Sequence, residues 1–121
     1  MKIKNIVVEV KSVEDTLKEV MGKIKGGKSV KKKESISFSN IDIMRRVLTN
    51  KRLELIKAIK KYKPKSIYQL AKIVNRDSKS VNLDIRLLSK LGMVDLMPRE
   101  NGRENIIPTV DYEEIDVAIA I

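Results

Sequence analysis

Residues 49–91 carry three consecutive apolar patterns with helical spacing, and this segment restricts the possible fold more than any other. An α-helix presents the same face every three to four residues, so apolar residues at that spacing predict an amphipathic helix with one buried side. The apolar positions are Leu53, Leu55, Ile56, Ala58 and Ile59, then Ile67, Leu70, Ala71 and Val74, then Val81, Ile85, Leu88 and Leu91. Three such helices in so short a segment are expected to share one core.

Capping residues mark the predicted ends of these helices. Thr49 is a predicted N-cap, and Ser66 with Gln69 forms an S-x-x-Q capping box. The third helix, over residues 77–91, begins at Asp77 or Ser78, and Gly92 ends it as the C′ residue. Pro64 stops the first helix, so only short turns separate the three.

A hairpin is predicted directly after the third helix. Asn101-Gly102 is the preferred tip of a type I′ turn, and it lies between two short apolar arms within residues 93–108. Pro98 and Pro108 indicate that both arms are edge-like. Three helices followed by a hairpin are typical of a winged helix-turn-helix, so the predicted fold class is α+β, with 77–91 as recognition helix and 93–108 as wing.

The remaining sequence predicts additions at both ends. Residues 2–11 read as a strand, and a helix capped by Ser12 and Asp15 runs to Gly26-Gly27. A short strand in 35–39 and a short helix capped by Asn40 follow. Large apolar residues occupy every second position from Ile115 to Ile121, which predicts a C-terminal strand in 111–121. We therefore expect an N-terminal extension (1–48), a winged helix-turn-helix (49–110) and a C-terminal strand (111–121). The extension and the last strand could form a homodimer, or they could complete the sheet of one monomer.

Composition excludes several kinds of site. The chain has no His and no Cys, so disulfides, Cys/His zinc sites and His-based catalysis are impossible. The acidic cluster Glu113, Glu114 and Asp116 lies in a predicted strand and loop, where carboxylates are usually solvated. We expect no enzyme activity, cofactor or metal. With 3% aromatic residues, the chain has few side chains to stack on RNA bases.

The net charge of +10 is unevenly distributed. Residues 49–91 carry 12 Lys or Arg and 3 Asp or Glu, whereas residues 92–121 carry 2 and 7. A basic middle and an acidic end favour a polyanion-binding surface next to a second, different surface. A lysine-rich surface of the thermophile kind is the alternative. The N-terminus lacks signal-peptide features, and the apolar "IDVAIAI" has about a third of the length needed to span a bilayer, so a cytoplasmic location is expected.

If the apolar stripe of the third helix points inward, its other side is free to contact DNA. Lys79 and Arg86 suit phosphate or guanine, Asn82 suits adenine, and Ser80 suits either phosphate or base. Leu83 is unusual on such a face, where it would touch a thymine methyl, another helix or a partner protein. An ordinary solvated surface is the alternative. The full predicted DNA-binding set is Lys65, Ser66, Tyr68, Arg76, Ser78, Lys79, Ser80, Asn82, Leu83, Arg86, Arg99, Asn101, Gly102 and Arg103.

Two parts of this set have equally simple structural explanations. Lys65, Ser66 and Tyr68 begin the second helix, where backbone phosphate is usually contacted, but they could serve only capping and solvation. Arg99 and Arg103 flank the wing tip beside Glu100 and Glu104, which would repel phosphate. These four residues could instead form a salt-bridge ladder across the hairpin.

The sequence resembles a family of small archaeal and bacterial predicted winged-helix transcriptional regulators that are distantly MarR-like. The resemblance extends from about residue 34 and includes the lead-in "SISFSNIDIMRRVLT". It rests on Leu48, Thr49, Arg52, Leu55 and Ile56; on Ser66, Ile67, Leu70 and Ala71; on Arg76, Asp77, Val81 and Asp84; on Leu91, Gly92, Met93 and Val94; and on Tyr112, Glu113 and Ile115. It implies sequence-specific DNA binding and regulation, with some relatives acting as antitoxin-like repressors. The chain departs from the family at Leu83, where polar or basic residues are common.

Two functions follow from these patterns. The first is a homodimeric regulator that binds double-stranded DNA and represses by occupancy. The second is a winged-helix protein-interaction module or antitoxin, in which Leu83 and the acidic C-terminal part bind a partner protein. Salt dependence separates them, because phosphate contacts release counterions and make DNA affinity fall steeply with salt.

Overall fold

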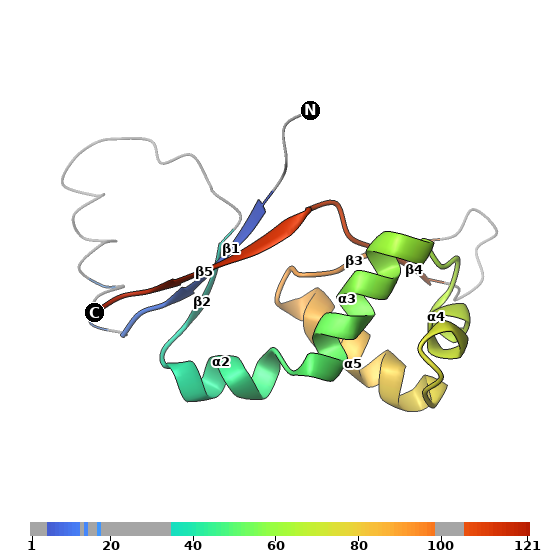
Figure 1. The fold of residues 1–121 in the computed structure, drawn as a ribbon, viewed down its shortest axis with the longest axis horizontal. Coiled ribbons are helices and arrows are strands. Elements are labelled where there is room, and N and C mark those ends of the chain that lie inside the picture. The colour runs from blue at the N-terminus through green and yellow to red at the C-terminus, as the bar shows by residue number, and fades with distance from the viewer. Residues whose placement is uncertain (1–4, 13, 15–16, 18–34, 99–105) are drawn as a thin grey trace. The chain divides into compact units, whose positions relative to one another are not determined.

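The computed structural model describes residues 5–12, 14, 17, 35–98 and 106–121, and these form two compact units. The sheet unit comprises Met1–Val47 and Tyr112–Ile121, and the helical unit comprises Leu48–Asp111. Helices and strands both occur, which confirms the α+β class (Figure 1). The elements are β1 (Asn5–Val10), β2 (Ser35–Phe38), α2 (Ile41–Val47), α3 (Asn50–Tyr62), α4 (Ile67–Ile73), α5 (Ser78–Lys90), β3 (Asp95–Pro98), β4 (Ile106–Thr109) and β5 (Glu114–Ile119).

The sheet unit brings both ends of the chain into one parallel sheet with the order β2-β1-β5. Alternate residues of β1 (Ile6, Val8 and Val10) are buried, as are Ile36 and Phe38 of β2. The registers place these side chains on one face, because Val8 is opposite Ile36 and Val10 is opposite Phe38. Within one chain, therefore, the terminal strands complete a common sheet, which was one of the two arrangements expected from the sequence.

The predicted N-terminal helix after Ser12 lies almost entirely outside the described residues. The short helix α2 begins where the sequence predicts, because the backbone N–H of Ile43 donates to Asn40 Oδ1 at 2.8 Å. An N-cap of this kind satisfies a donor that has no partner inside the helix. The N-cap at Asn40 is therefore confirmed.

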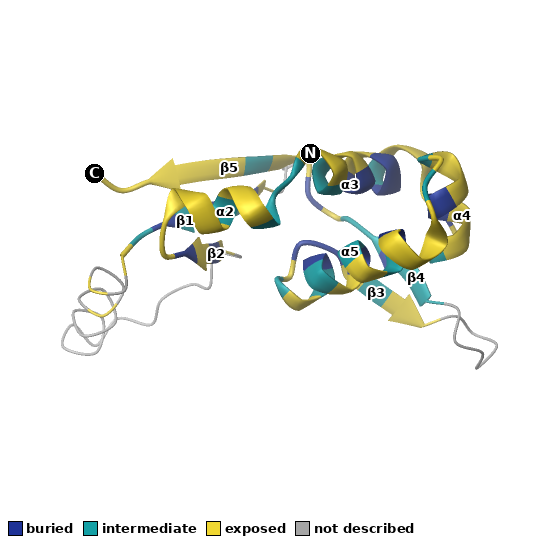
Figure 2. Cartoon of the chain, turned by 90° about the horizontal axis from the view of Figure 1, so that it is seen from below, coloured by how far each residue is buried: buried dark blue, intermediate teal, exposed yellow. Residues whose placement is uncertain are grey.

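The helical unit has one core made by the three predicted helices and the base of the hairpin. Leu55 and Ile59 of α3, Leu70 of α4 and Ile85 and Leu88 of α5 are almost completely buried. Met93, Val94 and Pro108 close the core from the hairpin side. Four residues of the predicted stripes, namely Leu53, Ile67, Val74 and Leu91, are only half-buried. Figure 2 shows the buried sides of α3, α4 and α5 in dark blue and their outer sides in yellow.

The predicted N-caps of these helices are present. Thr49 accepts from the N–H of Arg52 at 3.3 Å, and Ser66 accepts from the N–H of Gln69 at 3.0 Å. The side chain of Gln69 accepts from the N–H of Lys65 at 2.7 Å rather than from Ser66, so the capping box is displaced by one residue. Asp77, not Ser78, caps α5.

Left-handed residues end all three helices. Gly92 has φ of 83°, and the N–H of Met93 donates to the carbonyl of Leu88 at 2.9 Å, as in a Schellman motif. Asn75, with φ of 54°, ends α4 in the same way. Lys63, with φ of 48°, caps α3 directly before Pro64. Lys63 and Asn75 thus set the short turns between the helices, and Gly92 sets the turn from α5 into β3.

The hairpin arms are present as antiparallel strands, with pairs from Asp95–Thr109 to Pro98–Ile106. Strand β4 contacts both α3 and α4, and Pro108 is buried there. The predicted Asn101-Gly102 tip lies outside the described residues. The hairpin base is therefore anchored in the helical core.

Candidate functional site

The outer side of α5 carries a stripe of long side chains directly opposite its buried ridge. At about 100° per residue, Lys79, Leu83, Arg86 and Lys90 fall within about 60° of one another on the helix surface. All four are exposed, whereas Val81, Ile85 and Leu88 on the other side are buried. We call these four residues the outer stripe of α5.

Leu83 lies at the middle of this outer stripe. Its exposed fraction of 65% is among the largest of the described apolar residues. Lys79 is one turn before it and Arg86 is nearly one turn after it, so two cations flank an apolar centre. Asn82 is half-buried beside the stripe, and Ser78 and Ser80 are exposed in the first turn. The stripe thus combines positive charge with one exposed apolar side chain, Leu83, that can contact an apolar group of a ligand.

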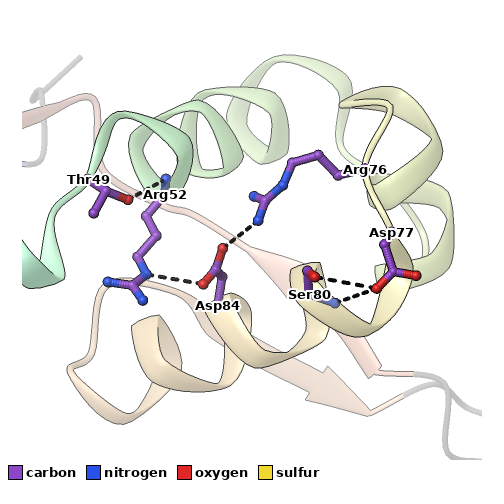
Figure 3. A network of polar contacts seen from close by, with 6 residues as sticks. All are labelled: Thr49, Arg52, Arg76, Asp77, Ser80 and Asp84. Carbon is purple, nitrogen blue, oxygen red and sulfur yellow. Dashed lines mark hydrogen bonds and ion pairs between the residues drawn. The ribbon is translucent and has the colours of Figure 1, made fainter.

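Asp84 ties α5 to the rest of the helical unit through two arginines (Figure 3). Its Oδ1 accepts from Arg52 Nε of α3 at 3.2 Å, and its Oδ2 accepts from Arg76 Nη2 at 2.9 Å. The Asp84 side chain is only 16% exposed. Charge-assisted hydrogen bonds in such shielded positions are stronger than surface ion pairs. This network fixes the orientation of α5 against α3 and against the turn that precedes it.

The same network gives Arg76 an intramolecular role. One terminal nitrogen, Nη2, is bonded to Asp84, while Nη1 is buried and has no hydrogen-bond partner among the described residues. The guanidinium is therefore directed into the fold and away from solvent. Arg76, which the sequence predicts as a DNA-binding residue, therefore supports the position of α5, and its contact with DNA stays a prediction.

The start of α4 presents exposed groups that also support the helix itself. The Ser66 hydroxyl is the N-cap, and the exposed Lys65 donates its N–H to Gln69. Tyr68 is exposed, and Lys72 Nζ lies 4.7 Å from the centre of its ring. A cation–π contact of this kind is worth about 0.5–1 kcal/mol at an exposed site. Capping explains Ser66, whereas Lys65 and Tyr68 keep side chains available to a ligand.

A pocket of about 320 Å³ lies between the end of α3 and strand β4. Its floor is apolar, with Ile59 and Pro108, and its lining includes Lys60, Lys63 and Lys65. Of these three lysines, the sequence pattern predicts only Lys65 as a DNA-binding residue. The segment "KKYKPK" concentrates these lysines at a helix end, and the return of β4 to that end forms the pocket beside them.

The wing residues of the predicted set, Arg99, Asn101, Gly102 and Arg103, lie outside the described residues. In the part of the chain that the structure does describe, no three acidic side chains are grouped as metal ligands. None of the described helices combines the length and apolar character needed to cross a membrane.

A family model matches residues 47–117, which is more than half of the chain. The chain belongs to the HVO_A0114 family. No curated protein and no solved structure matches the chain. The HVO_A0114 match covers the whole helical unit and reaches Val117 in β5. The matched segment includes the Asp84 network and the outer stripe of α5. The resemblance to MarR-like regulators stays a prediction.

Proposed function

We propose that the helical unit binds double-stranded DNA as a winged helix-turn-helix, and that the chain is a sequence-specific transcriptional repressor. The outer stripe of α5 carries this proposal. It is an exposed, cation-bearing helix face within a segment of net charge +9, and the Asp84 network holds the helix rigidly. A rigid helix can enter the major groove without first being ordered, which lowers the entropic cost of binding.

The side chains of the stripe suit different parts of a DNA groove. Arg86 and Lys79 can donate to guanine or phosphate, and the neighbouring Asn82 can form two hydrogen bonds with adenine. Leu83 between the two cations suits the methyl group of thymine. In this arrangement Leu83 contacts a base directly. A leucine at this position, in place of the usual polar residue, then predicts a thymine in the operator.

The lysines around the pocket support contacts to the DNA backbone. Lys63 and Lys65 are exposed and lie beside the first turn of α4, where their ammonium groups are available to a phosphate. The hairpin of β3 and β4 serves as the wing in this proposal. Repression then needs only occupancy of the operator in the cytoplasm, without catalysis or a cofactor.

Selection of bound duplexes from a random DNA pool tests this proposal directly. We expect one enriched sequence, palindromic if two copies bind, with affinity that falls steeply as salt rises. Lys79→Ala and Arg86→Ala should weaken binding, while Lys57→Ala serves as the control because it removes an exposed lysine of α3. No enrichment, together with no duplex binding at low salt, would refute the proposal.

Protein binding through the same unit is the second candidate function. It is favoured by the exposure of Leu83 and Tyr68, two large side chains that a DNA-binding surface does not require. An antitoxin would combine both activities. A protein-binding module without DNA affinity would show no duplex binding at low salt, so the same selection distinguishes the two functions.

A further inference from the structure

Among the described residues, no strand pairs with the outer edge of β5. In the described part of the chain, β1 is the central strand and β5 has a strand on one side only. The N–H of Ala120, just after β5, donates to the carbonyl of Val10 at 3.2 Å. Successive residues of a strand direct their backbone groups to opposite sides, so the odd-numbered Ile115, Val117 and Ile119 direct N–H and C=O outward. Three residues therefore offer main-chain hydrogen bonds along this edge.

The side chains of the same three residues extend the apolar face of the sheet. Ile115, Val117 and Ile119 are paired in register with Ile6, Val8 and Val10 of β1. Val8 is completely buried, but Val117 is 49% exposed and Ile119 is 50% exposed. Figure 2 shows β5 coloured almost wholly as exposed. Strand β5 has no Lys, Pro or Gly, and one of its two faces is wholly apolar, so its edge is open to pairing with another strand.

We propose that β5 pairs antiparallel with β5 of a second copy of this chain, with Val117 opposite the partner's Val117. The two sheets then join into one, and three pairs of outward-facing residues exchange about six main-chain hydrogen bonds. On the apolar face Ile115 is opposite the partner's Ile119. The apolar face then runs uninterrupted across the two-fold axis.

Charge and the length of paired strand together favour this register. On the polar face, Asp116 is opposite the partner's Ala118 and Glu114 is opposite the partner's Ala120, so no two acids face each other. Moving the centre to Asp116 would place two carboxylates directly opposite, which is destabilising. A centre at Ala118 also keeps the acids apart, but it pairs only residues 117–119 within β5, whereas a centre at Val117 pairs residues 115–119. The Asp116 carboxylate also accepts from Asn5 Nδ2 at 3.0 Å and so stays on the polar face of its own sheet.

This interface does not depend on DNA binding, so it can be measured on the full chain without DNA. The chain has no Cys, and a single introduced Cys therefore reports one position. We expect Val117→Cys to form a disulfide-linked dimer on mild oxidation, because paired Cα atoms in this register lie about 5.5 Å apart. Ala118→Cys is the matched control, because its Cα would lie about 8 Å from its equivalent, beyond the reach of a disulfide.

A second pair of variants tests the main-chain hydrogen bonds. Val117→Pro removes an outward N–H and leaves the pairing with β1 intact, whereas Val117→Thr keeps the N–H with a similar shape. Light scattering should show a dimer for the wild type and Val117→Thr, and about a hundredfold weaker dimer for Val117→Pro. A monomeric wild type, preferential cross-linking through Ala118→Cys, or a folded Val117→Pro that dimerises normally would overturn the proposal. If Val117→Pro does not fold, the cysteine pair decides.

Discussion

Arg76 Nη2 lies 2.9 Å from Oδ2 of Asp84, and this contact joins the turn before α5 to the middle of that helix. Arg52 of α3 reaches the other carboxylate oxygen at 3.2 Å. One side chain therefore holds three parts of the helical unit together. Because α5 carries the outer stripe, the geometry of the proposed DNA-binding surface depends on Asp84, which itself need not touch DNA.

Replacing Asp84 by Asn should destabilise the protein by about 2 kcal/mol, because two shielded guanidinium groups lose their counter-charge. Urea denaturation measures the loss. Asp95→Asn is the control, since Asp95 is an exposed carboxylate on β3, and its effect should stay within about 0.5 kcal/mol. Equal effects of the two substitutions would show that the network contributes nothing beyond a surface charge.

Lys63→Gly should move stability and DNA binding in opposite directions. Lys63 has φ of 48°, a conformation that costs a residue with a Cβ roughly 1 kcal/mol, and Gly removes that cost at the end of α3. The thermal midpoint should therefore rise. DNA affinity should fall, because one lysine of the pocket is lost. If the variant is more stable but binds DNA with unchanged affinity, Lys63 does not contact DNA.

Gly92→Ala gives the opposite stability effect. Gly92 has φ of 83°, and a Cβ added there would meet nothing within 4 Å. The loss of about 1 kcal/mol expected from thermal or urea denaturation therefore comes from the backbone conformation alone. A neutral substitution would mean that the turn after α5 relaxes without cost.

Local chemistry explains why most of the helical unit could be predicted from the sequence. The caps at Thr49 and Ser66 each involve partners within four residues, and apolar spacing alone identifies the buried side of α5. Such short-range signals are present in any window of the sequence. The positions of β3 and β4 follow from the same kind of pattern.

Contacts between distant residues could not be predicted. Arg52 and Asp84 are 32 positions apart, and β1 pairs with a strand more than a hundred residues away. Arg76 and Asp84 are only eight residues apart, but one lies in a turn and the other in α5, so no local spacing rule pairs them. Lys60, Lys63 and Lys65 are neighbours in sequence, but the pocket that they line exists only because β4 returns to the end of α3. Charge in a sequence identifies candidates, and only tertiary contacts separate positioning residues from contacting ones.

Leu83→Ala and Leu88→Ala remove the same atoms from opposite sides of one helix. Leu88 is completely buried, so its truncation should cost about 3–5 kcal/mol of stability. Leu83 is 65% exposed, so its truncation should change stability by less than about 0.5 kcal/mol. If Leu83 reads a thymine methyl, Leu83→Ala should weaken binding to the selected site and not to other duplexes. Unchanged preference would reassign Leu83 to protein contact.

Lys79→Ala and Asn82→Ala should separate the two ways in which α5 can bind DNA. A lysine on phosphate contributes to all sequences alike, so Lys79→Ala should weaken every duplex and lower the salt slope by about 1. An asparagine on adenine contributes only at its own base pair, so Asn82→Ala should cost about 1–3 kcal/mol at the selected site and little elsewhere. Fluorescence anisotropy over a salt series, with the selected duplex and a scrambled one, measures both. The proposal that α5 binds DNA would be wrong if Lys79→Ala left the salt slope unchanged and Asn82→Ala left the preference for the selected duplex unchanged.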